Sequence, residues 1–292
     1  MTLRTRVLTA VVASLSVAAA TACAPQDEPT TTPAASTSAS AATCTKDQLD
    51  LVTAGKFTVG TDKPAYGPWF SDDEPKNGKG YESAVAYAVA AQLGFAQDEV
   101  SWIVVPFTNA YAPGDKKFDV DINQVSITDA RRKAVDFSSG YYDVAQTIVS
   151  VKGSKIAGAT TIAELKDAKL GAQVGTTSYT AINEQIQPTE KAAVYDTNDL
   201  AVQALKNGQV DGIVVDLPTA FYMTAAQIDD GVIVGQLPAG SGTPDQFGMV
   251  LAKGSGLTSC VSQAVDALKT DGTLAKLESQ WLSNADGAPV LK

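Results

Sequence analysis

Hydrophobic and polar positions change in short blocks from residue 57 onward, and these blocks predict strands and helices in turn. Short apolar runs predict strands at 57–60, 100–105, 118–125, 170–174 and 212–215. Alanine-rich or amphipathic stretches predict helices at 83–93 and 200–206, a helix that begins at the capping box 161–164, and two helices within 257–282 that break at 271–272. This alternation predicts an α/β fold with parallel sheets covered by helices, and ligands at the carboxyl ends of strands.

The first 43 residues follow a different pattern. Arg4 and Arg6 precede an apolar stretch, 7–20, that ends in small residues and is shorter than the roughly 20 residues a membrane-spanning helix needs. The tract 24–43 has no large apolar residue and cannot bury enough surface to fold. We therefore expect a signal peptide at 1–22, a flexible linker at 23–43 and a folded body from residue 44.

The three cysteines divide by position. The segment Ala20-Thr21-Ala22-Cys23 resembles a bacterial lipobox, which implies a lipid-modified Cys23; ordinary cleavage that leaves a free thiol is the alternative. Cys44 opens the body and Cys260 lies near its end, so outside the cytoplasm we expect a disulfide, with two buried free thiols as the alternative. These expectations predict an exported protein, lipid-anchored to the outer face of the cytoplasmic membrane, at the cell surface or in the periplasm.

Composition narrows the possible chemistry. The sequence has no histidine, which excludes Ser/His/Asp and Cys/His nucleophile systems and any metal site that needs imidazole. No cysteines form a CxxC pair, so we expect neither a metal nor a cofactor. The net charge of −10 argues against nucleic acid as a partner.

Several motifs occur together in the body. The segment VSITDARRKAVDFSSGYY (125–142), with Gly60-Thr61-Asp62 before it and Gly175-Thr176-Thr177 and DGIVVD (211–216) after it, resembles the polar amino-acid-binding proteins of bacterial ABC importers, solute-binding protein family 3. The resemblance covers 44–292 and implies a two-lobed periplasmic-binding-protein-like fold of type II, with two hinge strands and a ligand cleft between the lobes. It implies a first lobe of 44–142 plus 247–292, a second lobe of 143–246, and hinge strands near 144–148 and 247–251.

The same resemblance implies a set of ligand-binding residues. A free α-amino acid is a zwitterion, so its site needs a cation for the carboxylate and an anion for the ammonium. Arg131 matches the position that binds the carboxylate, and Asp216 matches the acid that holds the ammonium. Ser126 matches a hydroxyl near both groups, and Thr177 matches a position whose amide and hydroxyl hold the carboxylate.

The remaining matches concern the ligand side chain. Tyr66 and Trp69 match an aromatic pair that walls the pocket, and Asp62 lies where the family reads the distal end of the ligand. Gln124 stands in a segment that is usually small and apolar, so we expect its amide near the pocket. Each role has a structural alternative: a solvated basic turn for Arg131, helix caps for Asp62, Asp216 and Thr177, and ordinary core for the aromatic pair. We also expect the segment 111–114 to form a lip on the cleft.

These features predict the extracytoplasmic substrate-binding component of an ABC importer for polar amino acids. The expected partners are a free amino acid, a membrane permease and the membrane itself through the lipid anchor, and the expected state is a monomer without enzyme activity. The sequence leaves open an enzyme on the same fold, such as a cyclohexadienyl dehydratase, and an amino-acid sensor receptor. The bound amino acid itself is not determined, although polar ligands such as glutamine come first and basic ones second.

Overall fold

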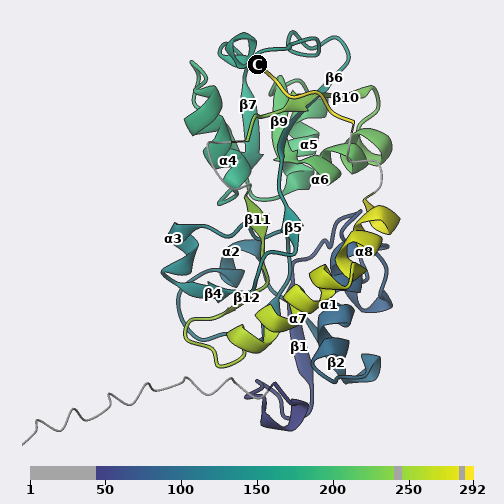
Figure 1. The fold of residues 1–292 in the computed structure, drawn as a ribbon. Helices are drawn as coiled ribbons and strands as arrows, with labels where there is room; N and C mark the ends of the chain where they lie inside the picture. Colours follow the sequence, from purple (N-terminus) through teal and green to yellow (C-terminus); the bar gives the residue numbers. More distant parts are fainter. Residues whose placement is uncertain (1–43, 240–244, 283–286) are drawn as a thin grey trace, which may run out of the picture. The chain divides into compact units, whose positions relative to one another are not determined.

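The computed structural model describes residues 44–239, 245–282 and 287–292. The expected signal peptide, linker and lipidated Cys23 lie outside the described residues. Two five-stranded sheets carry the fold, and a two-stranded sheet lies between them in Figure 1. We call the part built on each five-stranded sheet the first lobe and the second lobe, in chain order. No described helix is both long and apolar enough to cross a membrane.

The first sheet has the strand order β2-β1-β3-β12-β4. Its strands are β1 (Phe57–Thr61), β2 (Val100–Val104), β3 (Val120–Asp121), β4 (Val135–Phe137) and β12 (Val250–Ala252). The helices of this lobe are α1 (Tyr81–Gln92), α2 (Phe107–Ala110), α3 (Asp129–Arg132), α7 (Thr258–Thr270) and α8 (Thr273–Trp281). Short 3₁₀ turns lie at η1 (Lys46–Gln48), η2 (Pro75–Asn77) and η3 (Gln97–Glu99).

The second sheet has the strand order β10-β6-β9-β7-β8. Its strands are β6 (Gln146–Val151), β7 (Leu170–Gln173), β8 (Ala193–Tyr195), β9 (Gly212–Asp216) and β10 (Gly231–Gln236). The helices here are α4 (Thr177–Ala181), α5 (Asn198–Lys206) and α6 (Leu217–Tyr222), with a 3₁₀ turn η4 (Ile162–Leu165) and π turns η5 (Ile182–Ile186) and η6 (Met223–Gln227).

Both sheets are mixed, which corrects the expectation of parallel sheets. In the first, β1 pairs parallel with β2 and β3, whereas β12 is antiparallel to β3 and β4. In the second, β7 pairs parallel with β8 and β9, whereas β6 is antiparallel to β9 and β10. The reason is that the chain passes between the lobes twice, at β5 (Tyr142–Asp143) and β11 (Gln246–Phe247), which form the small sheet between them. β6 and β12 follow them directly, so each enters its sheet at the edge where the parallel strands end.

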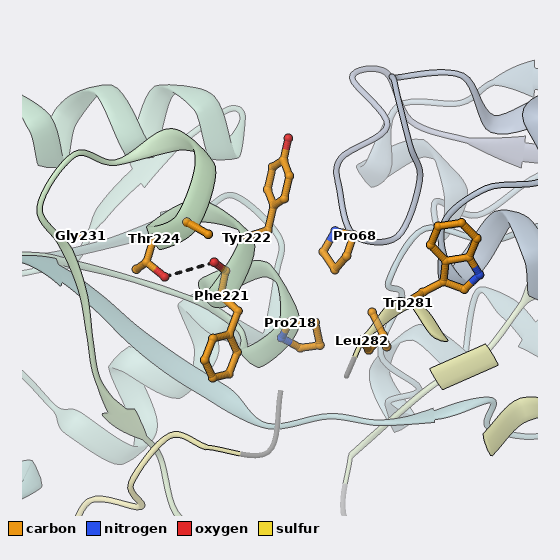
Figure 2. A pocket seen from close by; sticks show the side chains of 9 residues that line it. Pro68, Pro218, Phe221, Tyr222, Thr224, Gly231, Trp281 and Leu282 are labelled. Carbon is orange, nitrogen blue, oxygen red and sulfur yellow. Dashed lines mark hydrogen bonds between the residues drawn. The ribbon is translucent and has the colours of Figure 1, made fainter. Parts of the chain in front are cut away.

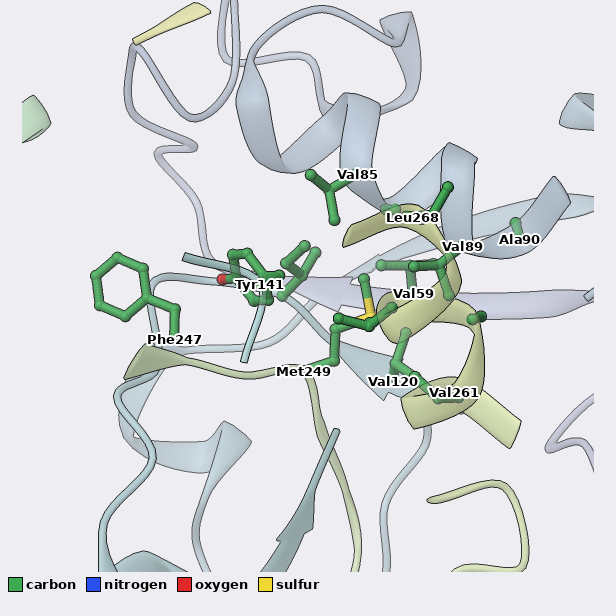
Figure 3. Packing of buried hydrophobic residues seen from close by; sticks show 14 of the residues in the cluster. Val59, Val85, Val89, Ala90, Val120, Tyr141, Phe247, Met249, Val261 and Leu268 are labelled. Carbon is green, nitrogen blue, oxygen red and sulfur yellow. The ribbon is translucent and has the colours of Figure 1, made fainter. Parts of the chain in front are cut away.

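The core of the first lobe follows from helical spacing. Figure 3 shows Val85 and Val89 of α1, and Val261 and Leu268 of α7, around Val59 and Val120 of the sheet, and all six side chains are buried. Positions three, four and seven residues apart share one helix face, so the apolar stripe of each helix meets the sheet. Burial of each such side chain stabilises the fold by about 1.5–3 kcal/mol.

Most predicted elements are confirmed, and two are shorter than predicted. The two helices that meet at Asp271-Gly272 are present as α7 and α8. The capping box at Thr161 is present, but it begins the four-residue 3₁₀ turn η4 and no longer helix. Of the strand predicted at 118–125, β3 keeps two residues, because the following chain turns toward the small sheet and Ser126 bridges to Phe247.

The predicted disulfide between Cys44 and Cys260 is present. It joins the start of the body to α7 across a sequence separation of 216 residues. In the entropic model a loop of this length stabilises the folded state by about 5 kcal/mol.

The end of the chain lies on the second sheet, although residues up to 292 were expected in the first lobe. Val290 bridges to Gln236 at the end of β10, and Leu291 is buried in the core of the second lobe. The amide of Lys292 donates to the carbonyl of Thr160, and its carbonyl accepts from Ile162. Figure 1 marks the C-terminus beside this sheet. The apolar side chain of Leu291, rather than chain order, decides this position.

Candidate ligand-binding cleft

The predicted polar residues converge on one small cavity between the lobes. The cavity encloses about 40 Å³ of accessible space, which is enough to hold water. The first lobe contributes Asp62, Tyr66, Phe107, Asn123, Gln124, Ser126 and Arg131, and the second contributes Gln173, Thr176, Thr177 and Asn198. The second-lobe residues lie at the carboxyl end of β7 or at the first turns of α4 and α5, where ligands bind in α/β sheets.

Arg131 lies in the last turn of the short helix α3, whose N-cap Thr128 accepts a hydrogen bond from the Arg131 amide. Its side chain is 8% exposed and makes one bond to each lobe. Nη1 donates to the carbonyl of Ser126 at 2.7 Å, and Nη2 donates to the carbonyl of Gly175 at 2.9 Å. A guanidinium has five N–H donors, so three remain for a carboxylate. The geometry excludes a solvated basic turn for this residue, because a solvated side chain would not be buried.

Ser126 and Thr177 face each other across the cleft. Ser126 Oγ and Thr177 Oγ1 are 2.9 Å apart, within hydrogen-bond distance. Thr177 is the first residue of α4, and the N-cap is its neighbour Thr176, whose hydroxyl accepts from the Tyr179 amide. The Thr177 hydroxyl is therefore not used for capping and points to the cleft, where it lines the cavity.

Asp216 ends β9 and lies beside the cavity, joined to it by Gln146. The Gln146 side-chain nitrogen donates to Asp216 Oδ1 at 2.9 Å and lies 3.4 Å from Thr177 Oγ1. Burial by the surrounding protein raises the pKa of Asp216 to about 7, while the Gln146 hydrogen bond and the positive charge of Arg131 act in the opposite direction. Hydrogen bonds thus link the predicted anion to the predicted cation: Arg131 bonds Ser126, whose hydroxyl meets Thr177, and Gln146 joins Thr177 to Asp216.

Asp62 directly follows β1, and its carboxylate both lines the cavity and bonds the first amide of helix α2. Its Oδ1 accepts from the Lys63 amide at 2.7 Å, and its Oδ2 accepts from the Phe107 amide at the start of α2 at 3.1 Å. Burial raises the pKa of Asp62, partly offset by these two hydrogen bonds. Tyr66 also lines the cavity, and burial raises the pKa of its phenol, with the nearby Asp199 carboxylate adding to the effect.

Gln124 has a backbone φ of 48°, in the left-handed region, and a buried carboxylate fixes its side chain. Glu82, which is fully buried in α1, accepts from the Gln124 amide at 2.7 Å and from the Gln124 side-chain nitrogen, and it also accepts from the Tyr141 hydroxyl. Burial raises the pKa of Glu82 to about 7. Gln124 thus lines the cavity while its backbone amide and its side-chain nitrogen are both bound to Glu82.

Sequence reasoning missed several residues that line the cavity or lie beside it. Asn123 was noted only as part of an unusual segment, yet it is buried, and its side-chain nitrogen has no hydrogen-bond partner among the residues described. Gln146 was missed because it lies between the motifs at 125–142 and 175–177, at the start of β6. The rule that ligands lie at the carboxyl ends of strands would have found Gln173, the last residue of β7.

Trp69 does not line the cavity. It is fully buried, its ring packs against Tyr81, Tyr142 and Phe247, and its indole nitrogen donates to Thr219 Oγ1 at 2.9 Å. Trp69 is therefore a residue of the hydrophobic core, and of the aromatic pair only Tyr66 lines the cavity.

A larger cavity of about 620 Å³ lies elsewhere between the lobes, and Figure 2 shows its lining. Pro68, Trp281 and Leu282 face Pro218, Phe221 and Tyr222, and no charged side chain lines it. A further cavity of about 610 Å³ is lined by Asp72, Asp73 and Asp199 without a cation, and one of about 330 Å³ that includes Lys116 and Lys253 lies within the first lobe. The smaller cavity combines a buried arginine with polar side chains of both lobes, so we assign the ligand site there. The described residues contain no cluster of acidic and cysteine side chains that could hold a metal ion.

This geometry defines a protein of two α/β lobes with a small polar cavity between them. The profile described as bacterial extracellular solute-binding proteins, family 3, matches residues 57–284, and the chain belongs to this family. A curated relative is the L-cystine-binding protein TcyJ of Escherichia coli (strain K12), 30% identical over 241 residues, which cover 82% of this chain and 85% of that protein. This similarity and the family match confirm the predicted family and the two-lobed fold.

Solved structures give the same result. An ancestral arginine-binding protein bound to glutamine is 31% identical, with a TM-score of 0.65, over 78% of this chain and 98% of that one. The ancestral amino acid-binding protein AncCDT-1, described as a precursor of cyclohexadienyl dehydratase, is 31% identical, with a TM-score of 0.63, over 78% of this chain and 95% of that one. The protein is thus similar both to binding proteins and to a precursor of an enzyme.

Proposed function

We propose that this protein binds a free polar α-amino acid between its lobes and delivers it to the permease of an ABC importer. The observation that carries the proposal is that opposite charges from two lobes, Arg131 and Asp216, are linked by hydrogen bonds through the Ser126–Thr177 pair and Gln146. A zwitterion fits both at once, and its carboxylate can take the remaining guanidinium donors. Because one small molecule contacts both lobes, binding favours the closed state.

The distal end of the cavity favours a ligand side chain that donates hydrogen bonds. Asp62 and the Gln124 carbonyl are acceptors, and the Asn123 amide adds one donor. This supports ligands with an amide, an amino or a guanidinium group, and the relatives named above bind cystine, arginine or glutamine. We rank glutamine and arginine first, with cystine next because its second amino-acid group could use the same acceptors.

Calorimetry with a panel of free amino acids tests the proposal. We expect at least one polar amino acid to bind, Arg131→Ala and Asp216→Asn each to weaken it strongly, and Lys253→Ala to bind as the parent does. Lys253 is a matched control because it is a cation of the first lobe that is paired with Asp136 away from the cleft. If no amino acid binds, or if both cleft variants bind as well as the parent, the assignment is wrong.

An enzyme on the same fold is the second candidate, favoured by the similarity to AncCDT-1 and by two carboxyl groups near the cleft with a pKa of about 7. Such groups are suited to act as acid and base at neutral pH. To discriminate the two functions, the protein is incubated with prephenate or arogenate, and the release of carbon dioxide and of the dehydrated, aromatic product is measured. Turnover that Glu82→Gln or Asp216→Asn abolishes would replace the binding proposal, whereas calorimetric binding of an unmodified amino acid without turnover supports it.

Export and anchoring complete the proposed function. A lipid on Cys23 with the linker at 23–43 would hold the body at the outer face of the membrane, within reach of a permease, as a monomer. Mass spectrometry of the purified mature N-terminus tests this point. A diacylated cysteine is expected, and an unmodified Cys23 or a chain that begins elsewhere would remove the anchor.

A further inference from the structure

Tyr111 holds a position that the charge pair does not require. It directly follows helix α2, as the C-cap residue, and belongs to the segment that was expected to form a lip. The start of α2 is fixed by the Asp62 carboxylate at the Phe107 amide, and the loop after Tyr111 is fixed by Lys116, which donates to the carbonyls of Asn109 and Ala112. Hydrogen bonds therefore hold the backbone both before and after Tyr111.

The Tyr111 side chain contacts both lobes. Within the first lobe its ring lies over the Arg131 guanidinium, with 4.4 Å between the guanidinium carbon and the ring centroid, and meets the Phe107 ring edge to face at 5.4 Å. Its hydroxyl donates to the carbonyl of Gly175 in the second lobe at 3.1 Å. The same carbonyl accepts from Arg131 Nη2. Tyr111, Arg131 and Gly175 thus form a triangle that spans the cleft.

Gly175 completes the fit because it lacks a side chain. Its φ is 72°, and a Cβ there would lie 2.3 Å from the Tyr111 hydroxyl oxygen, far inside contact distance. The second lobe can therefore approach Tyr111 this closely only with glycine at this position.

We propose that Tyr111 is a positioning residue of the ligand site: it stacks on Arg131 to orient the guanidinium, and its bond to Gly175 latches the cleft shut. The predicted effect on ligand release rests on the proposed function, whereas the contact between Tyr111 and Gly175 holds the lobes together with or without a ligand. Because the latch stabilises the closed form in both states, it slows release of a bound amino acid. In the free protein it holds the lobes together until they open to admit one.

Two variants separate the two contacts. Tyr111→Phe keeps the stacking and removes the hydroxyl, whereas Tyr111→Ala removes both. For a neutral hydrogen bond we expect Tyr111→Phe to raise the dissociation rate of the best-binding amino acid about five-fold. For loss of the cation–π contact as well, Tyr111→Ala should raise it roughly thirty-fold. Stopped-flow measurements of association and dissociation give both rates, and affinity should change less than the dissociation rate where the free protein is mostly closed.

A matched control is Tyr87→Phe. The Tyr87 hydroxyl donates to the Lys76 carbonyl and accepts from the Trp102 indole, so it also bonds and packs against an aromatic ring, but within the first lobe only. We expect this variant to leave both rates unchanged. Gly175→Ala gives a second check: its penalty on closure should be smaller in the Tyr111→Phe background, because the atom it overlaps is then absent.

The latch is also measured without ligand, so that its failure and the failure of the proposed function can be told apart. Nitroxide labels on Gln92→Cys in α1 and Gln203→Cys in α5, both at exposed positions, report the distance between the lobes by pulsed electron paramagnetic resonance. We expect Tyr111→Phe to shift the free protein toward longer distances. If neither the free-state distances nor the dissociation rate change, the latch is overturned. If no amino acid binds at all, the proposed function fails, and the free-state distances alone decide the latch.

Discussion

The two sides of the cleft treat their charges in opposite ways. Arg131, on the first lobe, is bonded to two carbonyls and covered by the Tyr111 ring; burial lowers its pKa, but from an ordinary value so high that the group stays charged at neutral pH. Asp216, on the second lobe, accepts from the Gln146 amide, and burial outweighs this bond enough to raise its pKa to about 7. The comparison teaches that the cation is preorganised, whereas the anion needs a positive partner to hold its charge at neutral pH.

Loss of the preorganised cation should have the largest effect. Arg131→Ala removes the charge, the fork and a contact between the lobes, and removal of one partner of a buried charge pair costs about 2–5 kcal/mol of binding. We expect affinity for the best amino acid to fall by two or three orders of magnitude, measured by calorimetry. Arg131→Lys keeps the charge without the planar fork and should recover only part of the loss. Full recovery would show that charge alone matters on this side.

The anion side should make binding depend on pH. The ammonium of the ligand should lower the pKa of Asp216 below its value of about 7 in the free protein, so binding releases a proton near neutral pH. Affinity should be constant above that pKa and fall by up to about tenfold per unit as pH drops below it. Glutamine is a suitable ligand because its side chain does not titrate.

The variant Asp216→Asn should bind weakly without this slope, when affinity is measured between pH 5 and 8. Glu82 has a raised pKa in the same range, so Glu82→Gln is the necessary control. If the pH dependence of affinity survives in Asp216→Asn but is lost in Glu82→Gln, the proton released on binding comes from Glu82 of the first lobe and not from Asp216.

The hydroxyl pair tests whether the two sides act as one unit. Ser126 and Thr177 share a single hydrogen bond across the cleft. Without ligand, Ser126→Ala and Thr177→Val should each lower the free energy of unfolding by about 1 kcal/mol, and the double variant by little more than either alone. Denaturant unfolding measures this. Additive losses would mean that each hydroxyl acts through another partner.

The smallest effect on the ranking of amino-acid ligands is expected at Trp69, which does not line the cavity. Trp69→Phe keeps an aromatic ring in the core and removes the bond from the indole to Thr219. We expect a loss of about 1 kcal/mol in unfolding free energy with the ranking of amino-acid ligands unchanged. Tyr66→Ala should do the reverse and change that ranking, because Tyr66 lines the cavity. Calorimetry with the same panel compares the two, and a changed ranking for Trp69→Phe would return it to the site.

Much of the fold could be predicted from the sequence because the signals are local. Helical spacing in 257–282 predicted α7 and α8, and the cysteine positions predicted the disulfide. The residues of the charge pair could be predicted through the family motifs, which keep their order along the chain. Strand direction could not, because nothing local in β6 or β12 shows at which edge the chain enters its sheet.

The sequence by itself determined which chemical groups the cleft can contain: guanidinium groups, carboxylates, hydroxyls and amides, and no imidazole. Only the tertiary structure decided where each points. It buried Trp69 against Thr219, turned Gln124 toward Glu82, and brought Tyr111 to Gly175, pairs that lie 150, 42 and 64 residues apart. Side-chain direction depends on contacts between distant segments, which periodicity and spacing do not encode. The absence of histidine thus excluded imidazole chemistry from the cleft, and the packing of the two lobes brought the remaining polar groups together around one cavity.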